Sequence, residues 1–153
     1  MIVAGIGARA CATAHEIVKA VTDCCRRNGL ETSELGLLAA LDRPETIAAV
    51  RAAAARLPSP DEGRNHDSNP TMRGLTRVFE GVKAVFFGVS ELQKQAARCI
   101  TNSERSLAAT GVPSVAEAAA LAAAGPEGML LAPRVAFATV TVALAIGPGA
   151  TEP

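Results

Sequence analysis

The sequence predicts a single α/β domain with three layers, in which helices cover both faces of a mixed, largely parallel sheet. Short apolar runs of strand length alternate along the chain with longer segments of helical periodicity, which is typical of such folds. The 153 residues suit one domain, which at this size buries about 68–70% of its unfolded surface without disulfides or metal. We expect the domain to span residues 1–147, followed by a flexible tail at 148–153.

The first strand is predicted at residues 2–6, an apolar run that ends where Gly5 and Gly7 permit a tight turn. The segment also fits the glycine-rich loop of dinucleotide-binding folds, in which pyrophosphate sits at the N-terminus of the next helix. In those folds an acid about 20 residues further on binds the ribose. Asp42 holds that topological place but lies 32 residues beyond Ala10, so a nucleotide-binding module is kept only as an alternative function.

The first helix is predicted to begin at Thr13, because Thr13 and Glu16 have the spacing of a capping box, in which each side chain bonds the other residue's amide. Apolar residues at helical spacing continue to about Arg27 and give this helix one buried face. Residues 35–41 form the second buried strand. Asp42 then stands where a helix cap belongs, before a helix whose first turn holds a proline.

The middle of the chain is predicted to be a polar surface loop at 58–70, since this stretch is crowded with turn residues. A short amphipathic helix is expected at 71–80, and a strand resumes at 82–87. Ser90 is the expected cap of the helix that follows.

The last third of the chain predicts a short helix that begins at about Ser103 and ends at Gly111, and an Ala-rich helix after it. Ser114 and Glu117 form a second capping box at the start of the Ala-rich helix. The remaining strands are expected at 129–131 and 138–146.

The loops after the predicted parallel strands gather at one sheet edge, where open α/β sheets bind ligands and helix N-termini offer amides to anions. The candidate ligand-binding residues are Gly5, Gly7, Arg9, Asp42, Ser90, Gly111, Ser114 and Arg134. Arg9 is the best-placed guanidinium, followed by Arg43 and Arg134. Asp42 and Glu117 are the candidate catalytic carboxylates for acid–base work, although both also occupy positions of helix caps.

Five segments stand in a characteristic order along the chain: MIVAGIGARA, GLLAAL closing on Asp42, FFGVSEL, ATGVPSVAEAAAL and TVTVALA. This ordered set resembles the family formed by CobE and the C-terminal domain of CbiG, which belongs to cobalamin (vitamin B12) biosynthesis. The resemblance rests on the whole set rather than on any one segment. It covers most of the chain, from the first strand to the last.

The resemblance implies that the chain takes part in cobalamin biosynthesis. CbiG-type proteins look like two-part enzymes that open the lactone of a cobalt-precorrin, and this chain is similar only to their C-terminal part. It therefore resembles the stand-alone CobE type, which implies binding of a precorrin or corrin intermediate, a tetrapyrrole, and its delivery between enzymes. A precorrin-modifying enzyme, such as a lactone-opening hydrolase, is the alternative. The implied partners are the corrinoid intermediate and other cobalamin-pathway enzymes, with homo-oligomerisation left open.

Composition argues against several other classes of protein. The formal charge is zero and the basic residues are scattered, so we expect no nucleic-acid partner. A signal peptide and an uninterrupted 18-residue apolar span are both missing, so we expect no membrane association and a cytoplasmic location. The four cysteines lack a C-x-x-C pair and only two histidines are present, so we expect reduced thiols, no metal and no cofactor.

Overall fold

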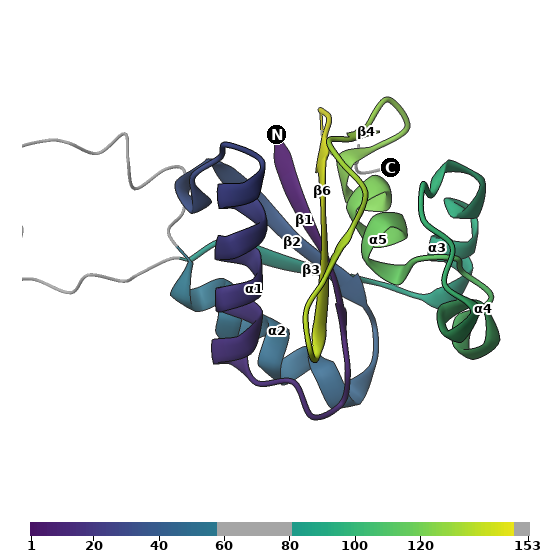
Figure 1. The fold of residues 1–153 in the computed structure, drawn as a ribbon, viewed down its shortest axis with the longest axis horizontal. Coiled ribbons are helices and arrows are strands. Elements are labelled where there is room, and N and C mark those ends of the chain that lie inside the picture. The colour runs from purple at the N-terminus through teal and green to yellow at the C-terminus, as the bar shows by residue number, and fades with distance from the viewer. Residues whose placement is uncertain (58–80, 149–153) are drawn as a thin grey trace, which may run out of the picture.

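A mixed sheet separates two helical layers in the computed structural model, which describes residues 1–57 and 81–148 (Figure 1). Within these residues the sheet has the strand order β3-β2-β1-β6-β4, and β5 also pairs with β6. The strands are β1 (Ile2–Ala8), β2 (Leu35–Leu41), β3 (Lys83–Phe87), β4 (Met129–Leu130), β5 (Val135–Ala136) and β6 (Val140–Ile146). The strands β1, β2 and β3 are parallel, whereas β6 is antiparallel to its three neighbours.

Helices cover both faces of the sheet, as Figure 1 shows: α1 and α2 lie on one side, and α5 lies on the other together with α3 and α4. Their bounds are α1 (Ala14–Arg27), α2 (Pro44–Arg56), α3 (Val89–Gln93), α4 (Glu104–Thr110) and α5 (Val115–Ala124). Single turns of 3-10 helix lie at Thr32–Glu34 and Ala96–Arg98. The predicted three-layer α/β fold with a mixed sheet is confirmed, and the parallel part of the sheet is β1, β2 and β3. The predicted loop at 58–70, the predicted helix at 71–80 and the tail beyond 148 lie outside the described residues.

Local hydrogen bonds fix the starts of three helices. The hydroxyls of Thr13, Ser103 and Ser114 each accept the backbone N–H of the residue three positions later, at 3.2–3.3 Å. Each therefore satisfies one of the amides that a helix leaves without an internal acceptor. Gly111 ends α4 with a φ of 73°, a left-handed conformation that glycine adopts at little cost. These predicted starts and the predicted stop are confirmed.

Two apolar layers fill the space between the sheet and the helices. The layer under α1 and α2 is built from branched side chains such as Ile17, Val21, Leu38, Val50 and Leu144. The layer under α5 consists mainly of alanines, including Ala116, Ala119, Ala120, Ala123 and Ala143. Because alanine side chains are small, the backbone of α5 lies unusually close to the sheet.

Gly5 and Gly7 lie inside β1 and form no turn, so that prediction is wrong. They pair with Ala143 and Thr141 of β6, and neither has a positive φ. Gly5 is needed instead because α5 crosses directly over it: a Cβ atom at this position would lie 1.9 Å from the carbonyl oxygen of Ala116. The turn that the dinucleotide-binding alternative requires is not formed by these residues.

Two predicted helix caps are also wrong. The N-cap residue of α2 is Arg43 rather than Asp42, and the N-cap residue of α3 is Gly88 rather than Ser90. Neither of these helices has a hydrogen bond from a capping side chain. The backbone N–H of Asp42 instead donates to the carbonyl of Phe87 at 2.8 Å, which extends the pairing of β2 with β3 by one residue.

The two predicted capping boxes form only in part, because their glutamates bond elsewhere. The carboxylate of Glu16 accepts the hydroxyl of Thr139, in the loop before β6. The carboxylate of Glu117 accepts from Ile100 and Thr101. Sequence spacing correctly identifies the helix starts, whereas tertiary contacts decide where the carboxylates go. The last strand begins at residue 140 rather than 138, after the short β5 that sequence periodicity does not predict.

Candidate functional site: an arginine-lined cavity

A cavity of about 340 Å³ opens at the carboxyl ends of β1 and β2. It lies between the first turn of α2, the helix α4, the first turn of α5 and the segment that carries β5 into β6. Its apolar lining includes Ile6, Leu41, Val50, Val115, Ala116, Phe137 and Val140. The cavity therefore lies at the edge of the sheet where ligands bind in open α/β folds.

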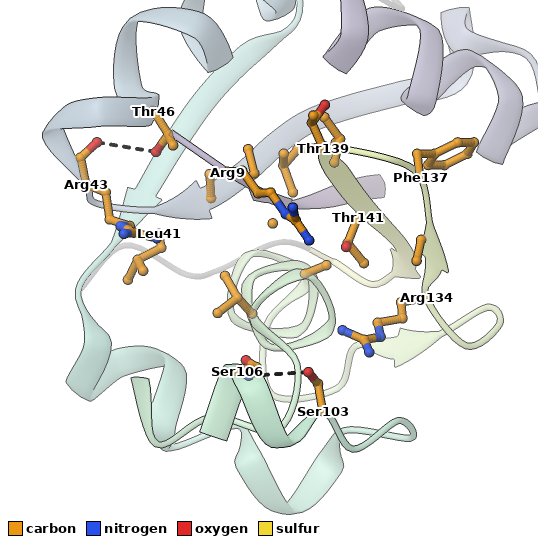
Figure 2. Close-up of a pocket in the computed structure, with 18 of the residues that line it drawn as sticks. Arg9, Leu41, Arg43, Thr46, Ser103, Ser106, Arg134, Phe137, Thr139 and Thr141 are labelled. Atoms are coloured by element: carbon orange, nitrogen blue, oxygen red, sulfur yellow. Dashed lines mark hydrogen bonds between the residues drawn. The ribbon is translucent and has the colours of Figure 1, made fainter. Parts of the chain in front are cut away.

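Four arginines line this cavity: Arg9, Arg43, Arg105 and Arg134. They come from four separate segments: the end of β1, the end of β2, α4 and the loop before β5. In Figure 2 the side chains of Arg9 and Arg134 point into the cavity beside Thr141, and Ser103 and Ser106 lie across it from Arg9. The four arginines therefore bring positive charge from separate segments to one cavity.

In residues 1–57 and 81–148, one acidic side chain pairs with a cavity arginine, and it does so only at long range. Among the residues that the structure describes, no Asp or Glu lines the cavity. Arg43 lies 3.9 Å from Glu45, but both side chains are about half exposed, so this pair is weak. Within the same residues Arg9, Arg105 and Arg134 have no ion pair and no side-chain hydrogen bond. A guanidinium group offers a fork of donors that matches carboxylate oxygens, so the cavity is suited to an anionic ligand.

Hydroxyl groups form the polar part of the lining. The cavity hydroxyls belong to Thr46, Ser103, Ser106, Thr110, Thr139 and Thr141. Several of them already donate to protein acceptors: Ser106 to the carbonyl of Val112 at 2.6 Å, and Thr110 to the carbonyl of Ser106 at 2.8 Å. A hydroxyl that already donates its hydrogen can only accept further hydrogen bonds, so it does not bind an anion. The guanidinium groups are therefore the main hydrogen-bond donors that the cavity offers to an anion.

The structure brings three of the predicted ligand-binding residues into the cavity: Gly7, Arg9 and Arg134. Arg43, which was predicted as the next best-placed guanidinium after Arg9, also lines the cavity. The other predicted ligand-binding residues do not line it: Gly5, Asp42, Ser90, Gly111 and Ser114. Gly5 packs against α5, Ser114 is a fully buried helix cap, and Ser90 and Gly111 are exposed near α3 and α4.

The two candidate catalytic carboxylates lie outside the cavity. Asp42 is exposed after β2. Glu117 is fully buried, and its oxygens accept the N–H groups of Ile100 and Thr101 at 2.9 Å each and the hydroxyl of Thr101. An acid–base role for either group stays a prediction.

Sequence reasoning missed Arg105 and the hydroxyls of α4. Arg105 lies in the first turn of α4, between Ser103 and Ser106, which also line the cavity. A signal was present, because Ser103, Ser106 and Thr110 recur at the 3–4 residue spacing of one helix face. A polar stripe of this kind marks a face but does not say what the face lies against.

The cysteines lie away from the cavity. Burial is the main cause that raises the pKa of the Cys24 and Cys99 thiols, and it raises the pKa of Cys25 to about 12, aided by Cys24 and Glu34. The buried thiols of Cys24 and Cys25 and the half-buried thiol of Cys99 are therefore protonated at neutral pH. In the described part of the chain, no three His, Cys, Asp or Glu side chains are grouped so that they could hold a metal ion.

Within residues 1–57 and 81–148, no single helix has the length and apolar composition of a membrane span. The helices α4 and α5 reach that length and composition only as a pair, bent by 68° at the break between them.

Comparison with known proteins identifies a family. The family model described as "Cobalamin synthesis G C-terminus" matches residues 64–145. A curated relative, Protein CobE from Sinorhizobium sp, is 29% identical over 147 residues, which are 96% of this chain and 80% of the relative. The solved structure of cobalamin biosynthesis protein chiG from Agrobacterium tumefaciens str. C58 is 32% identical with a TM-score of 0.64, over 97% of this chain and 99% of that one.

Two further solved structures share the fold. A crystal structure of CobE, a protein from the cobalamin biosynthetic pathway, has a TM-score of 0.76 at 24% identity, over 99% of this chain and 93% of that one. A cobalamin biosynthesis protein G homolog from Sulfolobus solfataricus has a TM-score of 0.58 at 20% identity. The match to the latter covers 94% of this chain but 36% of the longer protein.

Proposed function

This chain belongs to the Cobalamin synthesis G C-terminus family and is a cobalamin biosynthesis protein, and from that membership we propose that it binds a precorrin or corrin intermediate in the arginine-lined cavity. The observation that carries the proposal is the convergence of four arginines on an apolar-lined space in which, among the described residues, no acidic side chain takes part. Corrin intermediates are macrocycles fringed with carboxylates. Arginines would bind the carboxylates while apolar side chains contact the ring.

The size of the cavity supports binding at one edge of the macrocycle. Small-molecule sites in proteins typically measure about 300–1,000 Å³, and this one, at about 340 Å³, is at the small end of that range. A macrocycle held by one edge keeps its remaining surface available to another protein. We therefore propose that the chain delivers the intermediate between enzymes of the pathway.

The lining supports binding and delivery rather than catalysis. Among the described residues the cavity contains no Asp, Glu, His, Cys or Lys, the side chains that most often exchange protons at neutral pH. Arginine stays protonated at neutral pH, so the four guanidinium groups can bind and orient carboxylates but are not general bases. None of the described lining residues favours the lactone-opening alternative.

Titration with hydrogenobyrinic acid tests the proposed binding. The chain has no Trp and no Tyr, so it absorbs little near 280 nm and a bound chromophore is easily detected. We expect a shift in the visible spectrum of the ligand, elution of the ligand with the protein on gel filtration, and weaker binding as salt rises, since salt screens partly exposed charges. An ester derivative that lacks the side-chain carboxylates is the matched control and should bind poorly. An unchanged spectrum together with separate elution would show that the proposal is wrong.

A further inference from the structure

Glu117 is a fully buried carboxylate whose hydrogen bonds all go to one short loop. Its Oε2 atom accepts the N–H of Ile100 at 2.9 Å, and its Oε1 atom accepts the N–H of Thr101 at 2.9 Å as well as the Thr101 hydroxyl. Burying a carboxylate costs free energy unless hydrogen bonds replace those it makes with water. These three donors replace them, so the charged group can be buried here. In return, the carboxylate fixes the loop to the first turn of α5.

The loop held by Glu117 leads directly into α4. Thr101 lies two residues before Ser103, the N-cap of that helix. None of the side chains of α4 is buried, so apolar packing does little to hold the helix in place. Its start is tied by the bonds to Glu117 and by the N–H of Ser103, which donates to the carbonyl of Pro113 at 2.9 Å. The position of α4 therefore depends on polar bonds at its ends.

One wall of the cavity consists of α4 and its cap: Ser103, Arg105, Ser106, Ala109 and Thr110 all line the space. Arg105 is one of the four cavity arginines. We infer that Glu117 is a positioning residue for the anion-binding cavity, which holds α4 so that Arg105 faces the ligand. The inference rests on the proposed function for the ligand, but the anchoring of α4 is testable without any ligand.

Glutamine cannot replace Glu117 in this arrangement. Both carboxylate oxygens face a backbone N–H, one from Ile100 and one from Thr101. A carboxamide has only one acceptor oxygen, so in either orientation its NH₂ group opposes one of these two donors. Backbone donors cannot rotate to become acceptors, so Glu117→Gln breaks the anchor while it keeps the size and shape of the side chain. Thr101→Val is a milder variant that removes only the hydroxyl donor.

Hydrogen–deuterium exchange of the full chain tests the anchor directly. In Glu117→Gln we expect the amides of residues 100–110 to exchange about tenfold faster or more, while those of β1 and β2 keep their protection. Thr101→Val should change the same segment to a smaller degree. Glu127→Gln, an exposed glutamate with the same change of charge, is the control and should leave the segment unchanged. Unaltered exchange at 100–110 in a folded Glu117→Gln protein would overturn the inference.

A double-mutant cycle tests whether the anchor acts through Arg105, with hydrogenobyrinic acid as the probe. We expect Glu117→Gln to weaken binding about tenfold in the parent, the scale of one lost hydrogen bond to a charged group, and less than about twofold in an Arg105→Ala background. In an Arg134→Ala background the full loss should remain, because that arginine lies in the loop before β5. Equal losses of affinity in both backgrounds would show that Glu117 does not act through Arg105. If the parent itself does not bind the probe, the proposed function fails, and the exchange measurement alone decides the anchoring of α4.

Discussion

Gly5 in β1 lies directly under the backbone of Ala116 in α5: a Cβ atom at Gly5 would come within 1.9 Å of the Ala116 carbonyl oxygen. The same atom would lie 2.6 Å from the backbone nitrogen of Ala120. Both contacts are with backbone atoms of a helix, which cannot turn aside as a flexible side chain can. The distance between α5 and the sheet therefore depends on the absence of a side chain at Gly5.

Gly5→Ala should destabilise the protein strongly, because α5 must move away from β1 to accept the methyl group. We expect the free energy of unfolding to fall by at least about 2 kcal/mol, as measured by urea unfolding. Gly7→Ala is the matched control, since the nearest atoms to its new methyl group lie 3.7 Å away, an ordinary contact distance. It should cost less than about 1 kcal/mol. Equal losses for both variants would contradict this account of Gly5.

Arg9→Ala and Arg134→Ala should each weaken binding of hydrogenobyrinic acid by about 1.5–3 kcal/mol, the usual range for hydrogen bonds to charged groups. The melting temperature should hardly change, because neither side chain has an ion pair within the described residues. Binding is measured by spectroscopic titration. Arg26→Ala removes an exposed arginine of α1 that does not line the cavity, so its affinity should match that of the parent. Parent-like binding in both cavity variants would place the ligand elsewhere.

Ser114→Ala should lower the free energy of unfolding by about 1 kcal/mol, because the N–H of Glu117 loses its capping acceptor at 3.3 Å in a buried place. Ser90→Ala is the control, since Ser90 is exposed and is not the N-cap residue of α3. Its effect should stay within about 0.5 kcal/mol. Thermal and urea unfolding of the two variants, compared side by side, check the difference. A larger loss for Ser90→Ala would mean that α3 is capped by its side chain after all.

Stability should decline at alkaline pH because of Cys25. Burial raises the pKa of this thiol from 9.0 to about 12 in the folded state, whereas the unfolded chain ionises near the ordinary value. The folded state thus retains a proton that the unfolded state loses. The contribution of the Cys25 thiol to the free energy of unfolding is therefore complete below pH 9 and is lost progressively as pH rises toward 12.

Unfolding by urea at a series of pH values from 8 to about 10.5 measures this decline. Cys25→Ala should show a shallower loss of stability above pH 9 than the parent, whatever its stability at pH 8. Cys11→Ala removes an exposed thiol and should keep the slope of the parent. An unchanged slope in Cys25→Ala would show that another group causes the alkaline loss.

The elements that the sequence predicted correctly depend on interactions between close neighbours in the chain. The hydroxyls of Thr13, Ser103 and Ser114 bond amides three residues away, and Gly111 ends a helix through its own backbone angle. Such bonds form wherever the local segment folds, so spacing alone identifies them. The main strands could be predicted because an apolar run is likewise visible within a short stretch of sequence.

The predictions that failed depend on residues distant in the chain. Gly5 has the local pattern of a turn residue, but α5, more than 100 positions later, is what requires a glycine there. Glu16 and Glu117 have capping-box spacing, yet Thr139 and the loop at 100–101 bind their carboxylates. A donor brought by tertiary packing competes with the local amide, and the sequence does not reveal that competitor.

The residues that line the cavity could be predicted from the sequence only in part. Arg9 and Arg43 could be predicted because strand ends meet at one edge of a parallel sheet whatever the details of packing. Arg105 could not, because α4 buries none of its own side chains and is placed by bonds from the loop before it to Glu117 in another helix. The sequence determined the family, the layers and the sheet edge at which the cavity opens, since these follow from local pattern. The set of side chains around the cavity was decided only by the tertiary structure, because it depends on how separate segments are anchored to one another.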